Sequence, residues 1–325
     1  MNSRQQYGAI GLDIGGTKIA AGIVLWPTGE VLLRETIPTN PARSGEAVLA
    51  ETLALAGRLK DAAQRQEIEI AGIGAGVAEL VDCAGNVTSC CTIQWRGIPV
   101  QERLSTIAPA QVESDVRAAA VAEAMFGAGH GHRLWVYVTV GTGISYCLML
   151  DGQPLKGVNG NAITLSSSPL STTCTHCGAK LRPVLEEFAS GPAIAKRFVQ
   201  TKLVHGASSA TTCKGEDVFS AASNGDMDAL EILNSSGEAL GVSVAFLVNV
   251  LDPEIIVVGG GLGMAGGLYW EAFQRSCREH IFADNSRAVP IVTAKLGVDA
   301  GLVGAAAIVF AQRNRRKSEY AYETN

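Results

Sequence analysis

Short apolar runs separated by glycine-rich turns open this chain. Apolar residues fill Ala9 to Ile14 and Ile19 to Trp26, and Thr28-Gly29 follows as a hairpin tip. Residues 7–36 are therefore predicted to form two or three strands. The chain begins as strand–turn–strand and not as the strand–turn–helix of a nucleotide-binding P-loop or dinucleotide fingerprint.

Longer segments then repeat apolar residues at helical spacing, and they alternate with further apolar runs typical of buried strands. The alternation predicts an α/β protein, and 325 residues with 47% hydrophobic content allow one large or two ordinary domains with a sizeable core. We expect helices over 45–65, 100–105, 116–126, 185–189, 193–201, 214–221, 227–250, 270–282 and 301–313, and strands over 68–77, 111–113, 134–140, 146–150, 254–258 and 289–294.

Charge and cysteine usage narrow the class of protein. The net charge of −5 leaves no basic surface that favours nucleic acid, and no apolar run predicts a membrane span. Residues 1–6 are polar and lack the apolar core of a signal peptide. Eight cysteines form no dense framework, which favours a reducing, cytoplasmic compartment. The basic residues Arg313, Arg315, Arg316 and Lys317 are expected to solvate a terminal helix.

The first turn has the composition of a phosphate site. Gly15 and Gly16 let a backbone approach a phosphate, Thr17 and the backbone N–H groups can donate to it, and Lys18 adds charge. Asp13, at the end of the preceding strand, could hold a hydrated Mg²⁺ beside that phosphate. A tight hairpin with an incidental aspartate is an equally good interpretation of this turn alone.

The same theme recurs later in the chain. Gly141-Thr142-Gly143 follows an apolar strand and precedes another, and Gly259-Gly260-Gly261 follows a third. Two glycine–threonine turns, one in each domain and facing each other across a cleft, would form a nucleotide clamp. The pair is stronger evidence for a nucleotide site than either turn alone.

Asp115 sits between a predicted strand and a predicted helix. In the bland interpretation it is the N-cap of that helix, and N-caps are commoner than catalytic bases. In the functional interpretation it is a general base at the mouth of a sheet.

A cysteine pair, Cys174 and Cys177, has the Cys-x-x-Cys-Gly pattern of a zinc knuckle. A zinc site needs about four ligands, and only His176 offers a local third. The site is incomplete on spacing, so structural Zn²⁺ is doubtful.

The chain resembles the ROK family of sugar kinases and sugar-responsive repressors. The resemblance runs nearly end to end, and the segments that carry it are 13–18, 157–162, 174–178, 185–186, 190–192, 257–261 and 299–306. It implies an actin/hexokinase-like (ribonuclease H-like) fold of two α/β domains with a central cleft. The smaller domain would hold residues 1–116 plus 304–325, and the larger one residues 117–303.

The resemblance also implies ATP, Mg²⁺ and phosphoryl transfer to a sugar hydroxyl, with Asp115 as general base. Such transfer asks mainly for positioning and charge neutralisation. A homodimer is expected from the family. No DNA-binding helix-turn-helix precedes Asp13, which disfavours the repressor branch. The predicted ATP-binding residues are Asp13, Gly15, Gly16, Thr17, Lys18, Gly141, Thr142, Gly143, Gly260 and Gly261.

Several positions depart from the family pattern. The family's asparagine before the base is Ser114 here, its sugar-contacting glutamate is Thr164, and its sugar- and zinc-contacting histidine is Ser167. Ala78-Glu79 replaces a Pro-Gly pair, and Val184 replaces a zinc cysteine. The predicted acceptor residues are Glu79, Ser114, Asp115, Thr164, Ser167 and Glu186, with Gln94 and Trp95 as weaker guesses.

These departures predict a kinase whose acceptor is an aminosugar or a cyclitol rather than glucose. A lost charged hydrogen-bond partner typically costs about 1.5–3 kcal/mol of binding, so glucose should be rejected. One alternative is a catalytically silent sugar-binding or regulatory protein. The other is an ordinary glucokinase or N-acetylmannosamine kinase with an unusual zinc loop.

Overall fold

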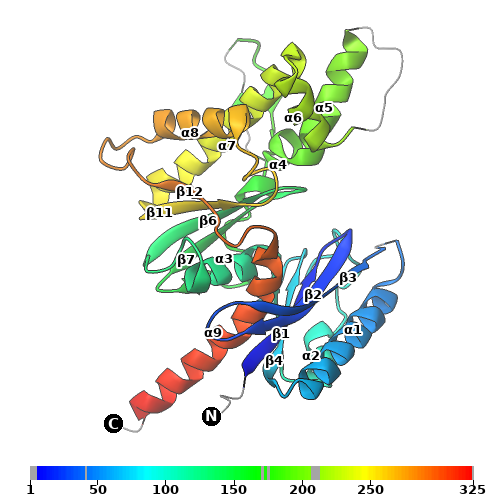
Figure 1. The fold of residues 1–325 in the computed structure, drawn as a ribbon. Helices are drawn as coiled ribbons and strands as arrows, with labels where there is room; N and C mark the ends of the chain where they lie inside the picture. Colours follow the sequence, from blue (N-terminus) through cyan, green and yellow to red (C-terminus); the bar gives the residue numbers. More distant parts are fainter. Residues whose placement is uncertain (1–5, 41, 170–171, 174–175, 206–212, 324–325) are drawn as a thin grey trace. The chain divides into compact units, whose positions relative to one another are not determined.

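The computed structural model describes residues 6–323 apart from 41, 170–171, 174–175 and 206–212 (Figure 1). The chain divides into two compact units. The first contains residues 1–132, 149–162 and 295–325, and the second contains residues 133–148 and 163–294.

A five-stranded sheet with the order β3-β2-β1-β4-β5 forms the centre of the first unit. Strands β1 (Tyr7–Ile14), β2 (Lys18–Leu25) and β3 (Val31–Pro38) are antiparallel neighbours. Strands β4 (Glu69–Val77) and β5 (Ala110–Ser114) run parallel to β1. The carboxyl ends of β1, β4 and β5 therefore meet at one edge of this sheet.

Helices cover both faces of the first sheet (Figure 1). Ile10, Leu12 and Ile14 of β1 share a buried cluster with Val48 and Leu49 of helix α1 (Gly45–Arg65). The short helix α2 (Val100–Ser105) joins the same layer. Side chains alternate along a strand, so the β1 residues between Ile10, Leu12 and Ile14 face the opposite side of the sheet.

That opposite side carries a row of glycines under helix α9 (Ala300–Glu323), which also contacts helix α3 (Asp115–Phe126). Gly11 pairs with Gly22 on β2 and Gly74 on β4. A Cβ on Gly11 would overlap the carbonyl oxygen of Leu302, and one on Gly74 would overlap that of Ala305. The glycine row lets the α9 backbone lie directly on the sheet.

The compact units differ from the predicted domain boundaries at 116/117 and 303/304. The predicted boundary 116/117 falls within α3, and 303/304 falls within α9. Both helices belong to the first unit, since α3 packs on α9 and α9 packs on β1 and β4. A Cβ on Gly304 would overlap the backbone of Ala118, which shows how closely the two helices approach.

The second sheet has the order β12-β11-β6-β7-β8. Strands β6 (Leu134–Val140), β11 (Ile255–Gly259) and β12 (Ile291–Thr293) are parallel. Strand β7 (Ile144–Leu150) follows β6 through a tight turn, and β8 (Gln153–Pro154) pairs antiparallel with the end of β7.

Helices α7 (Met227–Leu251) and α8 (Gly267–His280) pack on each other and on these strands to form the core of the second unit (Figure 1). Helices α4 (Glu186–Ala189), α5 (Gly191–Val204) and α6 (Gly215–Ser223) join them. The remaining short elements are η1 (Leu165–Ser167), β9 (Thr172–Thr173), β10 (Lys180–Leu181) and η2 (Gly297–Asp299).

Most predicted elements are present, but their ends differ. Helix α1 has the predicted bounds, whereas α9 continues ten residues past the predicted end at 313, through the basic residues. Helix α5 starts at Gly191, before its predicted start at 193, because Ser190 caps the helix and Pro192 lies in its first turn. In the described part of the chain, no helix combines the length and apolar character that a membrane crossing requires.

Candidate active site

The predicted phosphate turn in the first unit is a closed hairpin between β1 and β2. The N–H of Gly15 donates to the carbonyl oxygen of Lys18 at 3.1 Å. Thr39, which follows β3, braces the turn through its hydroxyl on the Gly15 carbonyl (2.6 Å) and its N–H on the Thr17 carbonyl (3.0 Å). The side chains of Thr17 and Lys18 remain exposed, so their donors are open to a ligand.

Two predicted carboxylates lie at the edge where β1, β4 and β5 end. Asp13 pairs with Gly76 in the register of β1 and β4, and Gly76 pairs with Glu113 in that of β4 and β5. A Cβ on Gly76 would lie 3.7 Å from the Cα of Asp115. The parallel strands thus bring Asp13 and Asp115, 102 positions apart in the sequence, to neighbouring strand ends.

Both carboxyl groups are harder to ionise than usual. Burial raises the pKa of Asp13, and the charge of Lys18 opposes the rise. Burial and the negative charge of Asp13 raise the pKa of Asp115 to about 6, against a hydrogen bond from the Val116 N–H (2.7 Å). A carboxylate with a pKa close to neutral is suited to accept a proton from a substrate.

Asp115 is not the N-cap of α3. Ser114 occupies that position in extended conformation, and Asp115 is the first helical residue. Ser114 is buried, and within the described part of the chain its Oγ has no hydrogen-bond partner. The N-cap interpretation of Asp115 is therefore wrong, because α3 begins at Asp115, one residue before its predicted start at 116.

Glu79 was predicted to contact the acceptor, but its carboxylate is already occupied. Oε1 accepts from the N–H groups of Thr92 and Ile93, and Oε2 accepts from the Cys91 N–H (2.9 Å) and the Ser89 hydroxyl. Glu79 thereby organises the 89–93 loop, which packs on the phosphate turn: a Cβ on Gly16 would meet Thr92 Cγ2 at 2.5 Å. The structure shows Glu79 anchoring this loop, and its contact with the acceptor stays a prediction.

The two weaker guesses lie near the same loop. Trp95 is fully buried in the core of the first unit, and its indole N–H donates to the Gly45 carbonyl at 2.8 Å. Trp95 is therefore a core residue. Gln94 is exposed.

The second unit gathers the other predicted glycine turns. The N–H of Gly141 donates to the Gly143 carbonyl (2.9 Å), and the Gly141 carbonyl accepts from the N–H of Gly191, at the start of α5 (2.9 Å). A Cβ on Gly141 would lie 4.0 Å from the nitrogen of Gly261, and one on Gly261 would meet nothing within 4 Å. Thr142 and Gly261 are exposed. The turn after β6 and the turn after β11 therefore form one glycine-lined surface.

Glu186 lies beside this surface. Its Oε2 accepts from the Ile144 N–H at 2.8 Å and would meet a Cβ on Gly143 at 2.6 Å. Thr164 and Ser167, at the two ends of η1, are exposed. Ser166 between them is buried and donates to the Ile144 carbonyl. Ile144 thus holds both Glu186 and η1 next to the Gly141–Gly143 turn.

The predicted metal residues are only partly described. Cys174 lies outside the described residues, while Cys177 is exposed and is a free thiol. Where the structure describes the chain, no group of three or more histidine, cysteine, aspartate or glutamate side chains gathers as a metal centre. The zinc knuckle stays a prediction.

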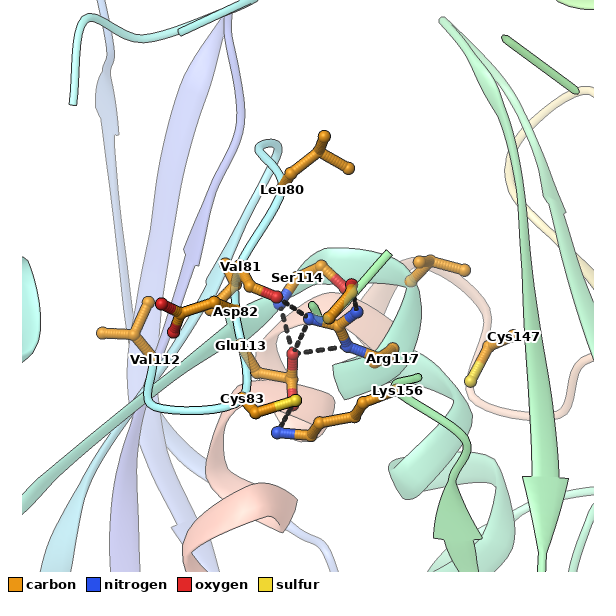
Figure 2. Close-up of polar contacts among 12 residues, drawn as sticks. Leu80, Val81, Asp82, Cys83, Val112, Glu113, Ser114, Arg117, Cys147 and Lys156 are labelled. Atoms are coloured by element: carbon orange, nitrogen blue, oxygen red, sulfur yellow. Dashed lines mark hydrogen bonds and ion pairs between the residues drawn. The ribbon is translucent and has the colours of Figure 1, made fainter. Parts of the chain in front are cut away.

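An ion-pair cluster that the sequence analysis did not identify joins Glu113, Arg117 and Lys156 (Figure 2). Arg117 pairs with Glu113 at 2.5 Å, and Lys156 pairs with the other oxygen of Glu113 at 2.6 Å. Glu113 and Arg117 are 4% and 6% exposed. The only sequence signal was the four-residue spacing of Glu113 and Arg117. Because Glu113 lies in a strand and Arg117 in a helix, that spacing does not predict that they pair.

The residues present fit the groups that the family resemblance implies. The backbone at Gly15, Gly141 and Gly261 leaves room where phosphates or a base would lie, whereas a Cβ on Gly16 or Gly260 would overlap Thr92 or Val140. Burial raises the pKa of Asp13, which lies next to Asp115, so a nearby cation would stabilise its charged form. Asp13 is therefore the residue that would hold Mg²⁺.

Comparison with known proteins assigns this chain to a family. The ROK family model matches residues 9–312. A glucokinase of Streptomyces coelicolor is 31% identical over 91% of this chain and 96% of its own length. The bifunctional enzyme NanE/NanK of Brucella melitensis is 32% identical over 91% of this chain and 53% of its own.

A solved structure agrees with both sequence matches. The ROK family glucokinase from Streptomyces griseus, in complex with glucose and AMPPNP, has a TM-score of 0.77 and 29% identity over 93% of this chain and 98% of its own. Its likeness confirms the predicted actin/hexokinase-like α/β fold. This chain belongs to the ROK family.

Proposed function

We propose that this chain transfers the γ-phosphoryl group of ATP to a hydroxyl of a sugar or sugar-like acceptor other than plain glucose. The chain is a phosphotransferase with an alcohol group as acceptor, in keeping with its family and its kinase relatives. One observation carries the proposal: Asp115, with a pKa near 6, stands at the strand edge that also holds Asp13 and the Gly15–Lys18 turn.

Asp115 acts as the general base in this proposal. Its carboxylate takes the proton of the acceptor hydroxyl as the hydroxyl oxygen bonds to the γ-phosphorus of ATP. The bond from that phosphorus to the β,γ-bridging oxygen breaks, and ADP leaves with the electron pair. Since the transition state is loose, positioning and charge neutralisation matter most.

The remaining residues bind and orient ATP. Lys18 and the backbone N–H groups of the Gly15–Thr17 turn would bind phosphate oxygens, and the Gly141–Gly143 and Gly260–Gly261 turns would accommodate the rest of the nucleotide. Mg²⁺, when bound, neutralises phosphate charge, and Asp13 is the residue that would hold it.

The identity of the acceptor is the finer part of the proposal. Thr164 and Ser167 offer hydroxyls where charged contacts to a hexose are expected from the resemblance. The buried Ser114 hydroxyl, without a partner in the described chain, supports a polar group of the acceptor meeting it. These features favour an aminosugar or a cyclitol.

The test is ATP turnover with Mg²⁺ against glucose, mannose, N-acetylmannosamine, an aminohexose and several cyclitols. Asp115→Asn serves as the inactive variant, and Asp61→Asn, on the exposed face of α1, is the matched control. We expect turnover on an aminosugar or cyclitol and little on glucose. Efficient glucose turnover would contradict the acceptor assignment and match the named activity of the Streptomyces relatives. Tight sugar binding without any turnover would contradict the kinase proposal.

The proposal also includes a homodimer in the cytoplasm. The free thiols of all seven described cysteines are compatible with a reducing compartment. Light scattering on the purified protein should give twice the 33.8 kDa mass of one chain. A mass of one chain at micromolar concentration would contradict the dimer.

A further inference from the structure

The guanidinium of Arg117 joins three separate segments of the first unit. Its Nε donates to Glu113 Oε1 (2.6 Å), one terminal nitrogen donates to the Val81 carbonyl (2.6 Å), and the other donates to the Gly160 carbonyl. Figure 2 shows these contacts converging on one buried side chain. Arginine suits this position because its planar donors serve several acceptors at once.

Glu113 extends the cluster. Its Oε1 also accepts the Ser114 N–H at 2.9 Å, and its Oε2 pairs with Lys156, which is partly exposed. The Lys156 carbonyl accepts the Ala162 N–H (3.0 Å), so residues 156–162 form a closed loop. The ion pairs therefore connect the base of this loop to the residue immediately before Ser114 and Asp115.

The two carbonyls held by Arg117 belong to segments that touch each other. A Cβ on Gly160, whose φ is +76°, would overlap the Val81 carbonyl oxygen, and the Cys83 thiol donates to the Gly157 carbonyl (3.2 Å). The 157–160 loop and the 79–83 segment are thus packed together, and Arg117, which binds a carbonyl of each, lies two residues after Asp115. The loop presents Val158, 94% exposed, and Asn159, also exposed.

We infer that Arg117 is a positioning residue that holds the 157–160 loop and the 79–83 segment as the acceptor-binding wall beside Asp115. The inference rests on the proposed kinase function. Without the guanidinium, two buried carbonyls and the Glu113 carboxylate lose charged donors, a loss that loosens the wall rather than the phosphate turn. The acceptor then finds a less preorganised wall beside Asp115, so its binding weakens while ATP binding does not.

The central experiment uses Arg117→Lys, which keeps the charge but cannot reach three acceptors in a plane. We expect KM for the acceptor to rise about tenfold or more while KM for ATP stays within twofold. Arg103→Met, an exposed arginine on α2 that pairs with Glu46, is the control and should leave both values unchanged. Equal loss for ATP and acceptor, or no loss, would overturn the inference.

A second measurement does not depend on turnover. Hydrogen exchange of the 156–162 peptide should accelerate in Arg117→Lys, with the peptide covering 13–18 unchanged. Glu113→Gln, which keeps the side-chain shape, serves if the lysine variant does not fold, and it should accelerate exchange in the same peptide. Unchanged exchange there would overturn the inference. Absence of turnover in the unaltered protein would instead overturn the proposed function. The exchange result would then still decide whether Arg117 holds the 156–162 loop.

Discussion

At the scale of single residues, the protonation of Asp115 should control the reaction. A general base works only when deprotonated, and the Asp115 pKa of about 6 places that change in the physiological range. We expect kcat/KM for the acceptor to rise from pH 5 to pH 7 with a midpoint near 6. A flat profile over this range, with Mg²⁺ and ATP saturating, would contradict the role of Asp115.

The same carboxylate should lower stability at neutral pH. Its pKa is higher in the folded protein than in the unfolded chain, so the unfolded chain releases the proton first as pH rises from 3.8. The folded state therefore loses stability up to about pH 6, on the order of 2–3 kcal/mol in total.

Asp115→Asn should recover that free energy of unfolding at pH 8 while abolishing turnover. Urea unfolding at pH 8 and pH 4 measures the difference, which should nearly vanish at the lower pH. The exposed control Asp61→Asn should show no gain. An Asp115→Asn variant less stable than the unaltered protein at pH 8 would contradict the argument.

Glu79 is expected to affect nucleotide binding through the loop that it anchors. In Glu79→Gln, an amide N–H₂ faces backbone donors that the carboxylate now accepts, so buried N–H groups lose partners at a cost of about 1–3 kcal/mol. Because the 89–93 loop packs on Gly16, the affinity for AMPPNP should fall. Calorimetry of AMPPNP binding measures this, and Glu46→Gln on the exposed start of α1 is the control. Equal affinities for the two variants would mean that the loop does not support the phosphate turn.

Sequence reasoning located the residues whose chemistry follows from their place at a strand end. Asp13 and Asp115 were found in this way, since parallel strands bring their ends together. The contacts of Glu79 and Arg117 could not be predicted, because the partners of Glu79 lie 10–14 positions away and two of the three partners of Arg117 lie 36–43 positions away.

At the scale of elements, the glycine row under α9 should be intolerant of any side chain. Gly74→Ala places a Cβ on the Ala305 carbonyl oxygen and must push α9 from the sheet, so we expect a loss of about 3 kcal/mol or more. Gly57→Ala, on α1 with nothing within 4 Å, should instead gain roughly 0.5–1 kcal/mol. Chemical denaturation of both variants tests the pair, and equal effects would contradict the close approach.

The start of α1 was predicted correctly, whereas that of α5 was not. Ser44 caps α1 through the Ala47 N–H, and the helix begins at the predicted residue 45. Ser190 caps α5 in the same way, but the predicted helix began at 193, although Pro192 is well tolerated in a first turn. The sequence predicted only strands at the glycine row. The helix that requires these glycines lies more than 200 positions later in the chain.

At the scale of the whole molecule, the division into units was the least accessible from sequence. The predicted boundaries followed the resemblance, whereas contacts assign α3 and residues 149–162 to the first unit. Those contacts include the Arg117 and Lys156 interactions, which join segments on either side of β6 and β7. Local patterns carry no information about such long-range partners.

The position of α9 in the chain sets an order on how the protein can be made. The helix that covers the glycine row comes after every residue of the second unit. The ribosome therefore synthesises the whole second unit before α9, the helix that covers the first sheet. Until then, one face of that sheet in the nascent first unit remains uncovered. During synthesis, the later unit can become compact before the earlier one.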